Sequence, residues 1–168
     1  MSPGNLICLN RSVLAFMESV LTPDAAVLEF GAGWSSRWFA DRCARLTSIE
    51  TSDEWAQRVR RDLAGAACKW EVRLVDDMWL GVKDLAPVDL ILVDGPELLR
   101  KFSSQVGWPL LKPGGWLVFD DAQREIQAGA VKWLKEFSGS PGRPLRWQSG
   151  DIDSARERLA LAFRKNRQ

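Results

Sequence analysis

The sequence contains no histidine and no tyrosine. Without histidine, the chain lacks the commonest general base, the commonest metal ligand and every serine–histidine or cysteine–histidine nucleophilic pair. Any chemistry must therefore depend on carboxylates, lysine, arginine, backbone dipoles or a bound cofactor. Tryptophan, by contrast, occurs nine times. Because an indole ring buries a large area, we expect most of these side chains to pack in or around the core.

Cysteines are few, and long apolar runs are missing. Cys8, Cys43 and Cys68 form no Cys-x-x-Cys pair, so reduced thiols are expected rather than a disulfide framework or a zinc site. No apolar run approaches the roughly 20 residues that cross a bilayer, and the N-terminal segment lacks the pattern of a secretion signal. We therefore expect a cytoplasmic protein without a membrane partner.

The numbers of positively and negatively charged side chains nearly balance, with 23 lysines and arginines and 22 aspartates and glutamates. The formal net charge is +1, which gives no general attraction to nucleic acid. We therefore expect no nucleic-acid partner, and a small-molecule substrate fits this composition better.

The length of 168 residues predicts a single domain, residues 1–168. Strand-like and helical segments alternate five times, which is typical of an α/β fold with a mainly parallel, doubly wound sheet and helices on both faces. Residues 145–147 and 159–163 alternate between apolar and polar side chains. Because the segment between them is too short for a crossover helix, these two strands are predicted to be antiparallel. A helix is also predicted within residues 1–22, ahead of the first strand.

The stretch from Val27 to Ser36 combines a buried strand with a glycine turn. Gly31 and Gly33 permit positive φ and leave room for a ligand beside the backbone. Ser35 or Ser36 is expected to cap the following helix with its hydroxyl. A strand, a glycine turn and the start of a helix together predict a binding site for a nucleotide-like ligand.

Acidic residues follow all five predicted parallel strands. Ligands of doubly wound sheets bind beyond the carboxyl ends of the strands. One such acid has an ordinary explanation, because aspartate often caps a helix or closes a turn. Five at the same edge favour a functional site instead, and they are Glu29, Glu50, Asp76 with Asp77, Asp94, and Asp120 with Asp121.

An acid at the position of Glu50 can accept hydrogen bonds from the hydroxyls of an adenosine ribose. An NAD-dependent dehydrogenase would use such an acid too. Its fingerprint, however, has a third glycine where this chain has Ser36. The dehydrogenase hypothesis is therefore the weaker one.

Several motifs together resemble the class I S-adenosylmethionine-dependent methyltransferases. They are the Glu-x-Gly-x-Gly motif of residues 29–33, the acids Glu50 and Asp94, the Leu-Lys-Pro-Gly-Gly motif of residues 111–115, and the antiparallel final pair of strands. The resemblance covers about residues 10–165. It implies a Rossmann-like sheet of seven strands in the order 3-2-1-4-5-7-6, with strand 7 antiparallel.

The resemblance also implies a site for S-adenosylmethionine. Gly31 and Gly33 would lie against the methionine part of this cofactor, and Glu50 would bind its ribose. Asp76 or Asp77 would contact the adenine edge. Glu29 and Ser35 complete the predicted cofactor-binding residues.

Within that superfamily, Asp94 with the pair Asp120 and Asp121 is similar to the divalent-cation-dependent O-methyltransferases. Three carboxylates suit Mg²⁺, which prefers oxygen ligands. Asp94 and Lys101 are the predicted catalytic residues, Lys101 as an assisting cation, and Arg100 beside it is a further candidate. The chain departs from the pattern of these relatives at Pro96 and Glu97, where a second aspartate or a lysine is common, and the general base is unassigned.

Three functions follow from the sequence. The leading one is methyl transfer to an oxygen of a small molecule, with Mg²⁺ as a candidate cofactor. The second is methylation of nucleic acid or protein, although the chain has no Asn/Asp-Pro-Pro-aromatic motif after the fourth strand. The third is a non-catalytic cofactor-binding or assembly subunit. Since no insertion covers a substrate, either the substrate is large, or the segment 1–22 or a second copy in a homo-oligomer is expected to supply the cover.

Overall fold

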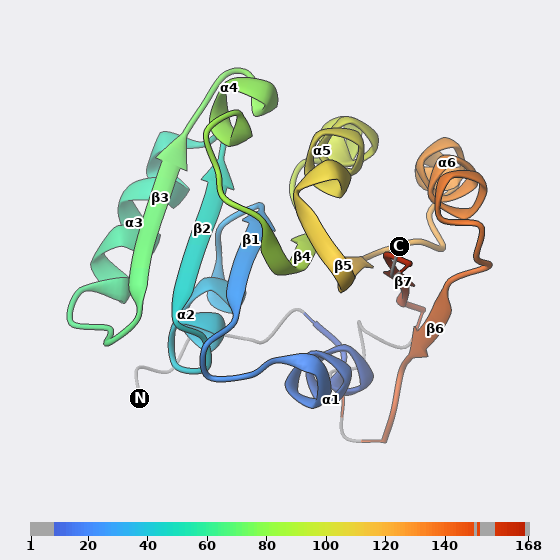
Figure 1. Ribbon diagram of the computed structural model, residues 1–168, viewed down its shortest axis with the longest axis horizontal. Coiled ribbons are helices and arrows are strands. Elements are labelled where there is room, and N and C mark those ends of the chain that lie inside the picture. The colour runs from blue at the N-terminus through green and yellow to red at the C-terminus, as the bar shows by residue number, and fades with distance from the viewer. Residues whose placement is uncertain (1–8, 150, 152–156, 167–168) are drawn as a thin grey trace.

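The computed structural model describes residues 9–149, 151 and 157–166. Helices and strands alternate along most of this chain (Figure 1). The strands are β1 (Ala26–Phe30), β2 (Arg45–Glu50), β3 (Lys69–Leu74), β4 (Val88–Val93), β5 (Leu111–Phe119), β6 (Arg143–Arg146) and β7 (Leu159–Arg164). The α-helices are α1 (Arg11–Val20), α2 (Trp34–Ala40), α3 (Asp53–Leu63), α4 (Met78–Val82), α5 (Arg100–Gly107) and α6 (Ala128–Ser138). Three short 3-10 helices are η1 (Glu97–Leu99), η2 (Trp108–Leu110) and η3 (Glu125–Gln127).

The seven strands form one sheet in the order β3-β2-β1-β4-β5-β7-β6. Strands β1 to β5 are parallel, and β7 runs antiparallel to both β5 and β6. The predicted fold class and strand order are therefore confirmed. Because the first five strands share one direction, the acids that follow them gather at one edge of the sheet.

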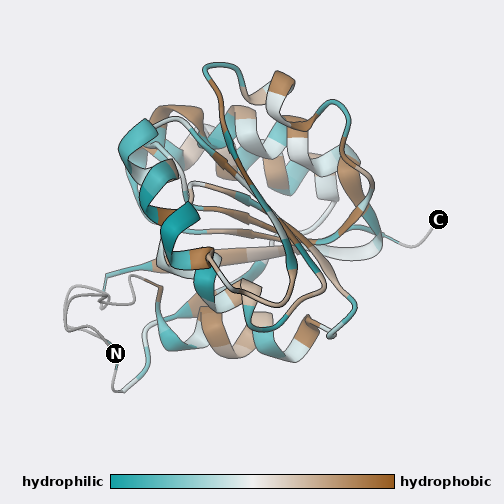
Figure 2. Ribbon diagram, turned by 90° about the vertical axis from the view of Figure 1, so that its left-hand side faces the viewer, coloured by the Kyte–Doolittle hydropathy of each residue, from teal (hydrophilic) through white to brown (hydrophobic). Residues whose placement is uncertain are grey.

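Helices cover both faces of the sheet (Figure 2). One core cluster joins α1, α2 and α3 to one face, and a second joins α4, α5 and α6 to the other. Strand β1 divides its side chains between them, since Val27 belongs to the first cluster and Leu28 and Phe30 belong to the second. This two-residue alternation of a buried strand directs Glu29 toward the side of α2.

The Leu-Lys-Pro-Gly-Gly motif of residues 111–115 forms the start of strand β5. The strand already begins at Leu111, and its pairing with β4 shifts between Val88 and Leu90. Gly114 has a φ of +85° in this irregular segment. The proline and glycines therefore lie in an irregular segment within the strand.

Helix α1 begins after Asn10, whose side chain accepts a hydrogen bond from the Val13 N–H at 2.9 Å. The Asn10 amide also donates to the Leu145 carbonyl of β6 at 3.3 Å. On the same face, Phe16 packs edge-on against Trp116 of β5. The predicted cover formed by residues 1–22 falls partly on residues 1–8, which lie outside the described residues. In the part of the chain that the structure describes, no helix is long and apolar enough to cross a membrane.

Candidate functional site

The glycine turn follows β1 and touches the loop that follows β4. Gly31 has a φ of +94° and donates its N–H to the Ile49 carbonyl at 2.9 Å. A Cβ atom at Gly31 would lie 2.5 Å from the Cα of Gly95. Only glycine fits there, because both the φ angle and the space exclude a side chain. The predicted glycine turn is thus fixed against the loop that carries Asp94.

Gly33 stands in a different environment. Its backbone is extended, with a φ of −170°, and a Cβ atom there would meet nothing within 4 Å. Gly33 is also the N-cap residue of α2, so neither Ser35 nor Ser36 occupies that position, although Ser36 takes part in the cap as the third residue of the helix. Ser36 acts from inside the first turn instead, where its hydroxyl accepts from the Gly33 N–H at 3.0 Å.

Glu29 lies fully buried beneath the glycine turn. The hydroxyl of Ser35 donates to one of its oxygens, and those of Ser36 and Ser48 donate to the other at 2.5 and 2.8 Å. Burial raises the pKa of Glu29 to about 7, although the three hydroxyls act in the opposite direction. Glu29 therefore holds the turn and the start of α2 from below.

Glu50, at the end of β2, connects the glycine turn to the start of α3. One carboxylate oxygen accepts from the Ala32 N–H at 2.9 Å. The other accepts from the N–H groups of Thr51 and Ser52 at 2.6 and 2.8 Å. The carboxylate is only 6% exposed, and these bonds fix its direction.

A cavity of about 540 Å³ lies over these loops, and we call it the glycine-loop pocket. It includes the predicted residues Gly31, Gly33, Ser35, Glu50 and Asp94. The remaining lining residues come from the N-terminal segment, the loops after β1, β2 and β4, and helices α2 and α3. They are Leu9, Ala32, Trp34, Thr51, Ser52, Trp55, Arg58, Val59, Asp62, Gly95 and Pro96.

Six of the predicted site residues do not line this pocket, and two of them, Asp120 and Asp121, belong to the group of carboxylates described below. Glu29 is beneath it, and Asp76 and Asp77 are exposed beyond β3. Asp77 caps α4, since its side chain accepts from the Trp79 N–H at 2.8 Å. Lys101 is exposed on α5. The structure therefore brings the glycine turn, Glu50 and Asp94 together, but neither the acids after β3 nor Lys101 reach the same cavity.

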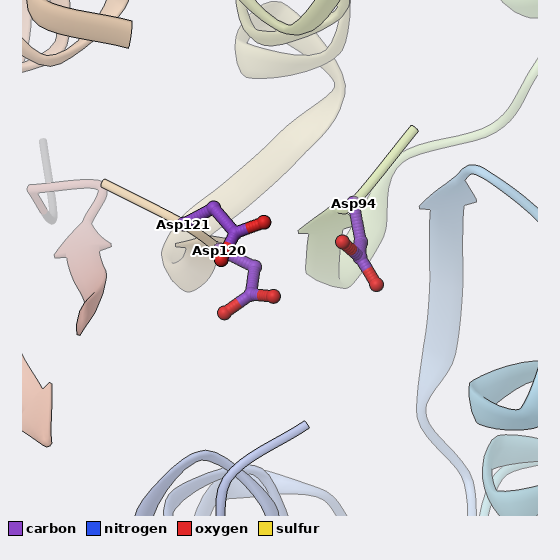
Figure 3. A group of neighbouring side chains, drawn as sticks. All are labelled: Asp94, Asp120 and Asp121. Carbon is purple, nitrogen blue, oxygen red and sulfur yellow. The ribbon is translucent and has the colours of Figure 1, made fainter. Parts of the chain in front are cut away.

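Three carboxylates gather beyond the ends of β4 and β5 (Figure 3). Asp94, Asp120 and Asp121 each offer an oxygen within 4.8 Å of the others, and we call them the acidic cluster. Asp121 is the one non-glycine residue with positive φ among the described residues, at 54°. This conformation is uncommon outside glycine, and it directs the two consecutive aspartates of the cluster differently.

Asp120 is the most isolated member of the acidic cluster. It is fully buried, and neither of its carboxylate oxygens has a hydrogen-bond partner among the described residues. Burial, together with the charges of Asp94 and Asp121, raises the pKa of Asp120. Burial likewise raises the pKa of Asp94, although Arg100 acts in the opposite direction.

Three arginines surround the acidic cluster. Arg100 lies 3.1 Å from Asp94 and 3.7 Å from Asp121. Arg124 lies 3.2 Å from Asp121 and also pairs with Glu97. Arg158 approaches Asp120 and Asp121 at 3.9 and 3.7 Å.

From the sequence, Arg100 is only a candidate beside Lys101, and neither Arg124 nor Arg158 is predicted to belong to the site. A local signal existed for Arg100, which stands in the first turn of the helix that follows Asp94. Arg158 is distant in sequence from both strand ends, so only the fold places it here.

The acidic cluster offers the oxygen ligands that Mg²⁺ prefers. The unpartnered oxygens of Asp120 are the observation that suits a cation best, because a buried carboxylate without a partner is costly. The three residues therefore fit a divalent cation, in competition with the arginines beside them.

Known proteins were compared with this chain by sequence and by structure. A family model described as a methyltransferase domain matches residues 28–122, which include the glycine turn and the acidic cluster. No curated protein matches the chain by sequence.

Solved structures share the fold. A candidate O-methyltransferase from Klebsiella pneumoniae superposes with a TM-score of 0.71 at 17% identity, over 98% of this chain and 84% of that chain. The O-methyltransferase TomG from Streptomyces achromogenes, involved in tomaymycin synthesis and solved with S-adenosylmethionine, gives 0.67 at 19% identity, over 92% and 78%. The N-methyltransferase NodS from Bradyrhizobium japonicum, solved with S-adenosylhomocysteine, gives 0.63 at 21% identity, over 92% and 85%.

The first two of these proteins are described as O-methyltransferases and the third as an N-methyltransferase, so the same fold occurs with different acceptor atoms. The family match covers more than half of the chain, including the loops that form the glycine-loop pocket. The chain belongs to the methyltransferase-domain family, within the class I S-adenosylmethionine-dependent methyltransferases.

Proposed function

We propose that the chain transfers a methyl group from S-adenosylmethionine to an oxygen atom of a small molecule. The observation that carries this proposal is the glycine-loop pocket, in which one cavity joins the glycine turn, Glu50 and Asp94. S-adenosylmethionine, when bound, supplies an electrophilic methyl group. The acceptor hydroxyl would lose its proton to solvent, its oxygen would bond to that carbon as the carbon–sulfur bond breaks, and S-adenosylhomocysteine would leave.

The residues of the pocket have distinct tasks in this proposal. Gly33 leaves open space where a side chain would stand, so a ligand can approach the backbone there. Glu50 has one oxygen with a single backbone partner, the Ala32 N–H. Since a carboxylate oxygen accepts about two hydrogen bonds, that oxygen can still accept one from a ribose hydroxyl. A contact of Asp76 or Asp77 with adenine would have to form outside the pocket lining.

Mg²⁺ belongs to the proposal as a second cofactor. Asp94, Asp120 and Asp121 would hold it, because their oxygens lie within 4.8 Å of one another. A bound divalent cation would make an acceptor hydroxyl more acidic. No residue is assigned as a proton acceptor, since Lys101 is exposed and lines no part of the pocket.

The proposal of a small-molecule acceptor rests on the net charge and on the residues that follow β4. The net charge of +1 gives no attraction to nucleic acid, and Asp94-Gly95-Pro96-Glu97 differs from the motif that holds an amino group. Leu9 lines the pocket, so the segment 1–22 is a source of cover for the substrate. A second copy of the chain is the other source.

Thermal unfolding with S-adenosylhomocysteine tests the donor site. At about 100 times its dissociation constant, this ligand should add about 2.7 kcal/mol to the unfolding free energy. Glu50→Gln should lower the affinity at least about tenfold, whereas Glu54→Gln, on the exposed start of α3, should not change it. Stabilisation by NAD instead of S-adenosylhomocysteine would contradict the proposal.

Methyl transfer to a panel of small hydroxyl compounds, with and without Mg²⁺, tests the acceptor. We expect an O-methylated product whose yield rises with Mg²⁺. Binding of S-adenosylhomocysteine without transfer to any hydroxyl would favour the alternative of a non-catalytic cofactor-binding or assembly subunit.

A further inference from the structure

Arg100 is held in place by main-chain carbonyls. It is the first residue of α5 and is only 5% exposed. Its Nε donates to the Gly95 carbonyl at 2.8 Å, and its Nη1 donates to the Asp120 carbonyl at 2.7 Å. These bonds tie the loop after β4 to the end of β5, so the guanidinium cannot withdraw without leaving two carbonyls unpaired.

The third nitrogen of Arg100 faces the acidic cluster. Nη2 lies 3.1 Å from an oxygen of Asp94 and 3.7 Å from an oxygen of Asp121. One nitrogen therefore stands between two of the three carboxylates that would hold Mg²⁺. The remaining member, Asp120, has no hydrogen-bond partner among the residues that the structure describes.

A guanidinium and a divalent cation at the same carboxylates repel each other and compete for the same negative charge. Because main-chain bonds fix Arg100, this competition is built into the site. We propose that Arg100 is the resident cation of the acidic cluster: it positions Asp94 and Asp121 without metal, and it weakens the binding of Mg²⁺ by competing for the charge of these two carboxylates.

This inference rests on the metal part of the proposed function and is independent of the methyl acceptor. The measurement is a titration with Mn²⁺, followed by electron paramagnetic resonance, on the full chain without S-adenosylmethionine. We compare the wild type with Arg100→Gln, which removes the charge, and Arg100→Lys, which keeps the charge but loses the planar fork. The control is Arg37→Gln, because Arg37 forms an exposed pair with Asp41 on α2.

Arg100→Gln should bind Mn²⁺ at least about tenfold more tightly than the wild type. Arg100→Lys should show a smaller increase, because a single ammonium cannot hold both carboxylates and both carbonyls. Arg37→Gln should leave the affinity unchanged. Mg²⁺ should also raise the unfolding temperature of Arg100→Gln more than that of the wild type, which a purely structural role of Arg100 does not predict.

Unchanged or weaker Mn²⁺ binding by Arg100→Gln would overturn the inference. If that variant fails to fold, Arg100→Met also removes the charge, and unchanged or weaker Mn²⁺ binding by Arg100→Met would overturn the inference as well. Stabilisation by S-adenosylhomocysteine, measured on the same wild-type sample, tests the donor site separately. Failure of the proposed function is therefore distinguishable from failure of the role of Arg100.

Discussion

Gly31 and Gly95 meet backbone to backbone, since a Cβ atom on Gly31 would lie 2.5 Å from the Cα of Gly95 and 2.6 Å from its nitrogen. This contact joins the loop after β1 to the loop after β4. Both ends of the glycine-loop pocket, the glycine turn and Asp94, therefore depend on one close approach.

Gly31→Ala is expected to lower the unfolding free energy by about 2–4 kcal/mol, because a strained φ is combined with an overlap that two backbones cannot relieve. Urea unfolding measures the loss. Gly65→Ala is the control, since Gly65 has a φ of +81° but open space around it. It should lose only about 1–2 kcal/mol, and equal losses in both variants would contradict the argument from close approach.

Gly33→Ala should keep the stability of the wild type within about 0.5 kcal/mol. Gly33 is extended, and nothing in the protein lies within 4 Å of an added Cβ. The added methyl group would, however, occupy the glycine-loop pocket, so the affinity for S-adenosylhomocysteine should fall at least about tenfold. Isothermal titration calorimetry measures the affinity, and unchanged binding would place the ligand away from Gly33.

Glu29 should make stability depend on pH. Its folded pKa of about 7 lies above the ordinary value of 4.5. Its contribution is therefore fully present below about pH 4.5 and is lost as the pH rises through about 7. Between about pH 4.5 and 8, the stability of Glu29→Gln relative to the wild type should improve by roughly 3 kcal/mol. Urea unfolding across this range measures the change, and the exposed Glu54→Gln should show none.

Asp120→Asn should lose metal binding and should gain stability in the absence of metal. The raised pKa of Asp120 means that its contribution is complete below the ordinary value of 3.8 and is lost as the pH rises through the higher folded value. The variant should therefore gain about 1–3 kcal/mol over the wild type in alkaline buffer without metal, and little below the ordinary pKa of 3.8. Mg²⁺ should no longer stabilise it. The exposed Asp41→Asn is the control, and a variant that still responds to Mg²⁺ would remove Asp120 from the metal site.

The order of the elements and the edge that carries the site could be predicted from the sequence. Apolar runs such as Val27–Phe30 mark buried strands, and the acids that follow them share one edge once the strands are parallel. Gly31, Gly33, Glu50 and Asp94 do line one pocket. These features are local in the chain, so periodicity and spacing suffice to find them.

The partners of those residues depended on tertiary structure. Ser48 donates to Glu29 because β2 pairs with β1 in the register that places Ser48 beside Glu29. Asp77 follows a strand as Glu50 does, yet it caps α4 outside the pocket. Strand ends look alike in sequence, and only the positions of the loops separate them.

Hydrophobic periodicity predicted the alternating strands and helices, because it acts locally, whereas the resemblance to methyltransferases supplied the strand order and the expected contacts of the methyl donor. The position of Arg100 between Asp94 and Asp121, and the approach of Arg158 to the same carboxylates, follow from the tertiary structure alone. Ion pairing across strand ends depends on distances between distant segments, and packing of the whole sheet sets those distances.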